Sequence, residues 1–70
     1  MVNVTKEQAL QRMDADFKGT LVIKEDGSVW FAVFGEKLNN EEIKKVKYIS
    51  RIGDAMTRAN AKRNINKYCS

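Results

Sequence analysis

The side chains that most often carry out catalysis are scarce in this chain of 70 residues. It has no histidine and a single cysteine, Cys69, so it lacks the commonest general base and cannot form a cysteine-based zinc site. Its carboxylates include two close pairs, Asp14 with Asp16 and Glu41 with Glu42. Carboxylates so near in sequence do not face each other across a scissile bond, as glycoside hydrolysis requires. We therefore expect a protein that is not an enzyme and uses no cofactor or metal ion.

One stretch nevertheless has acids at the spacing of metal ligands. From Asp14 to Glu25 the chain resembles the EF-hand calcium loop, with acids at loop positions 1 and 3, Gly19 at position 6 and a glutamate at position 12. The resemblance implies a calcium ion held by carboxylate oxygens. The chain departs from the family at position 5, where Lys18 replaces an oxygen ligand, and after position 12, where Asp26-Gly27-Ser28 predicts a turn and not a helix.

Length and composition indicate one small domain that spans residues 1–70. Hydrophobic residues make up 43% of the chain, which is enough for a folded core. No apolar run reaches the about 18 residues of a membrane-spanning helix, and the first residues lack the basic and apolar regions of a secretory signal. The lone cysteine either suits a reducing compartment or is an incidental residue. We expect a cytoplasmic protein with no membrane contact.

Local signals predict a short helix followed by a β-hairpin. Thr5 and Gln8 form a capping box at the start of residues 5–14, so we expect a helix there. The β-branched and aromatic runs at 20–23 and 29–34 predict the two strands of a hairpin.

The hairpin has two alternative registers, and they place Trp30 differently. A two-residue loop pairs Ile23 with Trp30, whereas a three-residue loop with Gly27 in a left-handed conformation pairs Ile23 with Val29. The second register collects only apolar side chains on one face and moves Lys24 to the other. We favour it, and it places Trp30 away from the main core.

The second half of the chain predicts a long helix. Asn39 and Glu42 match a capping box, and four apolar residues continue from there at helical spacing: Val46, Ile49, Ile52 and Met56. The expected fold class is therefore α+β in the order α-β-β-α, with a hairpin packed by a long C-terminal helix. Gly53 marks either a kink in this helix or a break, after which Asp54 caps a second helix.

A second apolar stripe follows and does not line up with the first. Ala61, Ile65 and Tyr68 lie nearly opposite Met56 on a helical projection. A straight helix cannot bury both stripes in one core. Either the chain bends, or the stripe meets a second copy in a homodimer, or residues 60–70 form a frayed tail that a partner orders.

Positive charge is concentrated in residues 41–70, which contain eight Lys+Arg and three acids within a chain of net charge +4. On the predicted long helix, five of the cations share one face: Lys44, Lys47, Arg51, Arg58 and Lys62. Such a face either contacts the phosphates of a nucleic acid or is simply solvated.

The hairpin has a second apolar surface, made by Val22, Trp30 and Phe34, which needs cover. Either a helix buries it, or a partner does, since tryptophan is enriched in the energetic centres of interfaces. We predict a small regulatory or inhibitory binding protein that masks a surface of a protein partner. The alternative is a nucleic-acid-binding accessory protein that uses the basic helix face.

Overall fold

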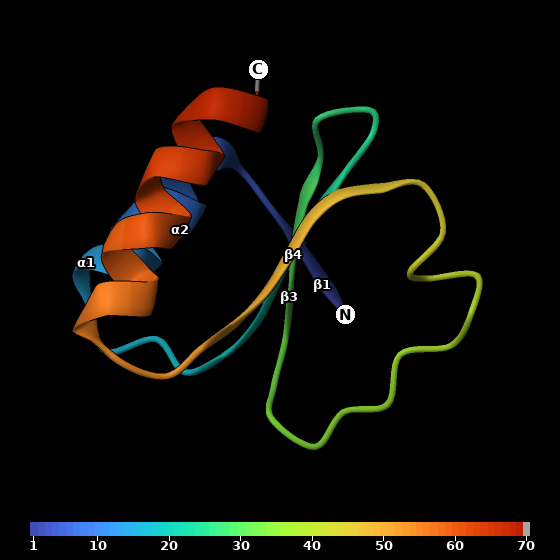
Figure 1. The fold of residues 1–70 in the computed structure, drawn as a ribbon, viewed down its shortest axis with the longest axis horizontal. Helices are drawn as coiled ribbons and strands as arrows, with labels where there is room; N and C mark the ends of the chain where they lie inside the picture. Colours follow the sequence, from blue (N-terminus) through green and yellow to red (C-terminus); the bar gives the residue numbers. More distant parts are fainter. Residues whose placement is uncertain (70) are drawn as a thin grey trace.

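A four-stranded antiparallel sheet organises the chain, and both helices lie on one side of it. The computed structural model describes residues 1–69. Their elements follow the order β1 (Val2–Val4), α1 (Lys6–Asp14), β2 (Gly19–Lys24), β3 (Val29–Ala32), β4 (Val46–Ile52) and α2 (Ala55–Tyr68). Across the sheet the strands lie in the order β1-β3-β2-β4. With the sheet seen nearly edge-on, the helices lie on one side and loop 33–45 on the other (Figure 1).

The α+β class is confirmed, but the expected order α-β-β-α lacks two strands. The first is β1, whose Val2 pairs with Phe31 at the outer edge of β3. Three residues are too few to show a period-two pattern, so the sequence carries no clear signal for this strand. The second missing strand is β4, which lies within the stretch expected to be helical.

The N-terminal helix forms as its capping residues predict. In α1 the hydroxyl of Thr5 accepts a hydrogen bond from the amide of Gln8 at 3.1 Å, and the side chain of Gln8 accepts one from the amide of Thr5 at 2.9 Å. The helix buries Ala9 and Met13 against the sheet. Residues 19–24 continue as the strand β2, so they do not wrap around an ion as an EF-hand loop does.

The hairpin of β2 and β3 adopts the three-residue register. Ile23 pairs with Val29, the amide of Gly27 donates to the carbonyl of Lys24 at 2.9 Å, and Gly27 has a φ of 85°. This left-handed conformation is the one expected of the bulge glycine. The strand β3 ends at Ala32, so the last part of the predicted strand, including Phe34, belongs to the loop.

The prediction of one long helix in the second half of the chain is wrong. Its first part is a loop followed by the strand β4. Asn39 and Glu42 do bond reciprocally, at 2.8 and 3.3 Å, but they close only a turn. Residues 46–52 then form β4, which pairs along β2 and supplies partners to its second edge. A capping box stabilises only a first turn, whereas strand pairing satisfies the backbone groups along the second edge of β2 and the inner edge of β4.

The regular structure breaks at Gly53, and a new helix with an N-cap begins directly after it. Asp54 is the N-cap of α2 and accepts a hydrogen bond from the amide of Thr57 at 2.8 Å, while the Thr57 hydroxyl accepts one from the amide of Asp54 at 3.1 Å. The Thr57 hydroxyl also donates to the Asp54 carboxylate at 3.0 Å. The bonds that this carboxylate accepts, from the Thr57 amide first and then from the hydroxyl, lower the pKa of Asp54. The alternative of a second helix capped by Asp54 is therefore confirmed.

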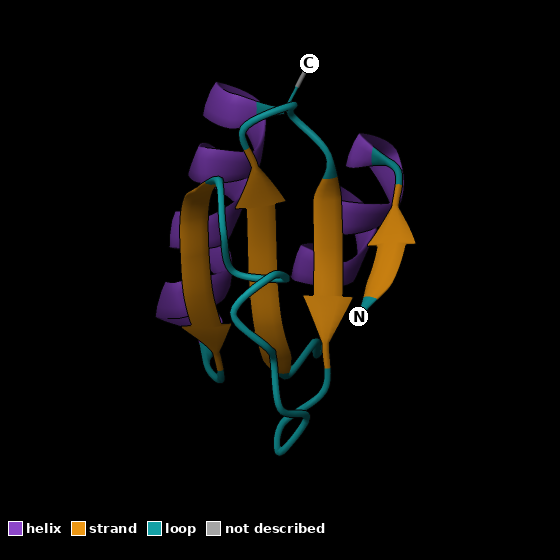
Figure 2. Ribbon diagram, turned by 90° about the vertical axis from the view of Figure 1, so that its right-hand side faces the viewer, coloured by secondary structure: helices purple, strands orange, loops and turns teal. Residues whose placement is uncertain are grey.

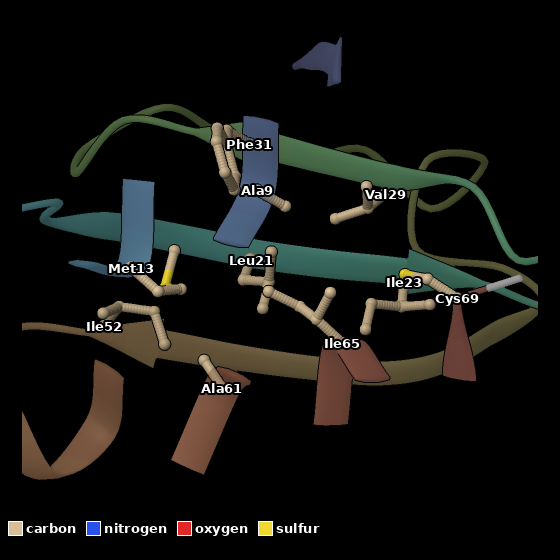
Figure 3. Close-up of a cluster of buried hydrophobic side chains, with 10 residues drawn as sticks. All are labelled: Ala9, Met13, Leu21, Ile23, Val29, Phe31, Ile52, Ala61, Ile65 and Cys69. Carbon is tan, nitrogen blue, oxygen red and sulfur yellow. The ribbon is translucent and has the colours of Figure 1, made fainter. Parts of the chain in front are cut away.

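The core lies between the helices and one face of the sheet, as Figure 3 shows. Its buried side chains come from both helices, from three strands and from Cys69, the residue that caps the end of α2: Ala9, Met13, Leu21, Ile23, Val29, Phe31, Ile52, Ala61, Ile65 and Cys69. Neither helix in residues 1–69 is long and apolar enough to cross a membrane.

The C-terminal stripe packs into this core. Ala61 and Ile65 have no exposed surface, and Tyr68 stacks against Tyr48 with ring centroids 6.4 Å apart. Met56, from the other stripe, is 81% exposed. Two of the three residues considered for a homodimer are thus inaccessible to a second copy. Residues 60–68 of the expected tail belong to α2, and Ser70 lies outside the described residues.

Shortening Ile65 to valine tests this placement. Ile65→Val should lower the free energy of unfolding by about 0.5–1.5 kcal/mol, because it removes one buried methylene. Chemical denaturation at two protein concentrations should show the same loss in the free energy of unfolding. Met56→Ala is the exposed control and should change little. A loss that shrinks as the protein is diluted would indicate that Ile65 lies in an interface between copies.

The ionised Asp54 that caps α2 should make the stability of the fold fall at acid pH. Asp54→Ala should lower the melting temperature by roughly 4–8 °C, and Asp54→Asn should lower it less because asparagine also caps helices. A lowered pKa stabilises the fold above the ordinary aspartate value, and the gain is lost as pH falls through the folded value. Below about pH 4 the parent chain should therefore lose stability relative to Asp54→Asn. Parallel thermal curves for the two proteins at every pH would contradict this.

Candidate functional site

The face of the sheet turned away from the helices carries aromatic, apolar and basic side chains. On this face Val22 of β2 lies between Trp30 of β3 and Ile49 of β4, since it pairs with both. Directly paired residues project to the same side of a sheet. One step along the strands, Thr20 pairs with Arg51 in the same way. These side chains form a strip across three strands, which we call the open face.

Loop 33–45 covers only part of the open face. Figure 2 shows this loop crossing in front of β2 on its way from β3 to β4, while β4 itself stands clear of it. Val22 accordingly has no exposed surface and Trp30 is half-buried. Ile49 is 48% exposed, and Phe34, which the loop carries, is 44% exposed. Apolar surface therefore remains accessible along β4 and beside the loop.

Two cations of this face lie over aromatic rings. The ammonium of Lys24 is 4.4 Å from the ring centroid of Trp30. The guanidinium of Arg51 is 5.0 Å from that of Phe34, which places the Phe34 ring beside β4. Both distances are within the range of cation–π attraction. Each pair presents a positive charge and an aromatic edge at the same place.

The orientation of Trp30 is held by a short chain of hydrogen bonds. The indole N–H donates to the hydroxyl of Ser28 at 2.9 Å, and that hydroxyl donates to Asp26 at 2.6 Å. The Ser28 hydroxyl and then its amide lower the pKa of Asp26, so the aspartate stays ionised and keeps its acceptor role. The indole is thereby fixed at the hairpin end of the open face.

Loop 33–45 is anchored near both of its ends. The α-ammonium of Met1 donates to the Glu36 carboxylate at 2.6 Å, and this contact raises the pKa of the ammonium and lowers that of Glu36. Near β4, the carbonyl of Lys45 accepts a hydrogen bond from the amide of Glu25 at 2.8 Å. These contacts hold the loop over the sheet.

The five cations predicted to share a helix face lie in three different parts of the fold. The prediction of a basic helix face is therefore wrong. Lys44 lies in the loop and pairs with Glu41, while Lys47 and Arg51 lie on β4. Arg58 and Lys62 lie on α2, on the other side of the sheet. The helical projection required one continuous helix, and the strand β4 and the break at Gly53 separate its members.

The two α2 cations join the helix to the segment after α1. The guanidinium of Arg58 donates to the carbonyl of Phe17 at 3.3 Å, and Lys62 forms an ion pair with Asp14. Lys24, in contrast, was not selected from the sequence and lies with Arg51 on the open face. Its contact with Trp30 depends on the hairpin register, which could have identified it.

The groups that this part of the structure presents are apolar, aromatic and cationic side chains. Residues 1–69 contain no group of three or more histidine, cysteine or acidic residues placed to hold a metal ion. Burial raises the pKa of the Cys69 thiol, which disfavours the reactive thiolate. The open face offers apolar area, aromatic edges and fixed positive charge. No family model, curated protein or solved structure matches the chain.

Trp30 fluorescence can report on the cover that Lys24 provides. Lys24→Ala should increase quenching of Trp30 by acrylamide, because the side chain over the indole is removed. Lys67→Ala, on α2, is the matched control and should leave quenching unchanged. Equal quenching in the parent chain and in Lys24→Ala would show that Lys24 does not cover the ring in solution.

Proposed function

We propose that this protein is a non-catalytic binding protein that regulates or inhibits a protein partner by covering part of its surface. One observation supports the proposal above all: Ile49 and Phe34 remain accessible next to exposed Lys47 and Arg51. Apolar and cationic groups at one place suit an interface with a desolvated centre and a charged rim. The partner surface would be apolar at its centre and acidic around it.

The predicted partner residues have unequal roles in this proposal. Phe34 is accessible and makes direct contact. Trp30 is half-buried, so its exposed part lies at the margin of the contact. Val22 is fully buried and supports the strip from below. Ile49 takes the central place that Val22 was expected to have, since the two residues are cross-strand neighbours.

The charge distribution supports an acidic partner. The chain carries a net charge of +4, and β4 contributes two cations to the open face and no acid. Charge complementarity of this kind speeds encounter and selects partners more than it adds affinity. Masking needs no cofactor or metal ion. The single cysteine is a free thiol, which supports the cytoplasmic location we propose.

Nucleic-acid binding is the second candidate function, and the two cation–aromatic pairs favour it. Exposed aromatic rings stack on unpaired bases, and the adjoining cations contact phosphates. Here the binding residues would be Lys24, Trp30, Phe34 and Arg51, not the predicted helix face. Affinity for a single-stranded oligonucleotide would then fall steeply as salt is raised, whereas a protein interface with an apolar centre depends on salt less.

Affinity capture with a paired variant tests the proposed function. The double variant Phe34→Ser/Ile49→Ser should capture at least tenfold less of the partner from native lysate than the parent chain, because it removes the apolar centre. Met56→Ser replaces another exposed apolar residue, on α2, and should capture as much as the parent.

Nuclease treatment separates the two candidate functions. A captured protein that survives nuclease and depends on Phe34 and Ile49 supports surface masking. Capture that disappears with nuclease supports the second candidate. Capture that is equal for the parent and the double variant would contradict both, since both require the open face.

A further inference from the structure

The strand β4 is a long edge of the sheet, and no strand from residues 1–69 lies on its outer side. It has seven residues and pairs with β2 on its inner side, whereas the opposite edge of the sheet is formed by β1, with three residues. Outer N–H and C=O groups of an edge strand can pair with another extended segment. The face of β4 opposite the helices stands clear of loop 33–45 (Figure 2).

The side chains along β4 alternate in exposure. Lys47, Ile49 and Arg51 are exposed, while the residues between them are partly buried and Ile52 is fully buried. An incoming strand would therefore meet the order cation, apolar, cation on its solvent side. Opposite charges directly across a strand pair stabilise it, and like charges destabilise it.

We propose that β4 accepts an extended segment of a protein partner as a fifth strand, and that this segment presents acidic, apolar and acidic side chains at alternate positions. In antiparallel pairing its central apolar residue would lie across from Ile49, with the two acids across from Lys47 and Arg51. This inference rests on the proposed function and adds the binding mode and the chemistry of the partner segment.

A second copy of this chain fits the edge poorly. Antiparallel self-pairing centred on Ile49 would put Lys47 across from Arg51 of the other copy, twice. Pairing centred on Tyr48 or on Ser50 instead puts Ile49 across from Lys47 or from Arg51 of the other copy. Residues 46–52 include no acid, so no self-pairing of β4 neutralises them. Charges at this position discourage association with another copy and leave the edge for an acidic segment.

A short peptide tests the inference in the full chain. The probe is acetyl-Thr-Glu-Thr-Val-Thr-Glu-Thr-amide, titrated to about 1 mM into isotope-labelled protein and followed by amide NMR. We expect shift changes centred on residues 46–52 and slower hydrogen exchange there. Lys47→Glu/Arg51→Glu should weaken binding at least tenfold, and a peptide with lysine in place of both glutamates should restore it.

Two controls separate strand pairing from charge attraction alone. A peptide N-methylated at alternate residues keeps its side chains but loses backbone donors along one edge, and it should not bind when methylated on the pairing edge. The variant Arg63→Glu/Lys67→Glu reverses as much charge on α2, and it should bind the original peptide nearly as well as the parent. Circular dichroism establishes that each variant is folded.

Several results would overturn the inference. These are an absence of change along β4 at the highest peptide concentration, equal binding by both N-methylated forms, or protection of β4 that grows with protein concentration in the absence of peptide. The last result would assign the edge to a second copy. If Phe34→Ser/Ile49→Ser still abolishes partner capture while the peptide fails, the proposed function stands and the fifth strand is wrong.

Discussion

The central strand β2 is the element on which the rest of the structure depends. Leu21, Val22 and Ile23 are consecutive and fully buried, although consecutive residues of a strand point to opposite faces. Both faces of β2 must therefore be covered, and both of its edges must be hydrogen-bonded. The hairpin supplies β3 to one edge. Only residues from the second half of the chain are left for the other, and β4 takes that place.

The two faces of the sheet are covered by different means, and this difference creates the candidate site. Two helices cover the face of Leu21 and Ile23 and bring Ile65 with them. With both helices on that side, the opposite face has only loop 33–45. A loop of this kind closes over Val22 and leaves Ile49 and Phe34 accessible. In a small domain, the surface that remains unburied on folding is available to a partner.

Positively charged side chains lie next to the apolar surface of the open face. The cations of β4 and Lys24 lie on the open face, whereas Lys62 is paired with Asp14 on the helix side. Positive charge next to apolar area disfavours contact between copies and favours an acidic partner. The proposed masking function and the proposed fifth strand both depend on the same few side chains, and they differ in whether the backbone of β4 takes part.

Interactions within a few residues were determined by the sequence itself. The capping box at Thr5 and the favoured register of the hairpin depend on contacts over three to six residues, so their residue types were enough to predict them. The cap at Asp54 was one of two alternatives that the residues around Gly53 allowed. Residues 46–52 could not be assigned in this way. Val46, Ile49 and Ile52 fit a helical stripe, while their β-branched side chains equally suit a strand. Pairing with a strand more than twenty residues earlier in the chain decided between the two.

The same long-range pairing determined where the basic residues and the C-terminal apolar stripe lie in the fold. Once residues 46–52 join β2, the cations of one projected helix separate onto a loop, a strand and a second helix. The break at Gly53 then turns α2 back across the sheet, which buries Ala61 and Ile65 and leaves Met56 exposed. A helical projection contains no information about which surfaces meet, because that depends on contacts between segments far apart in the chain.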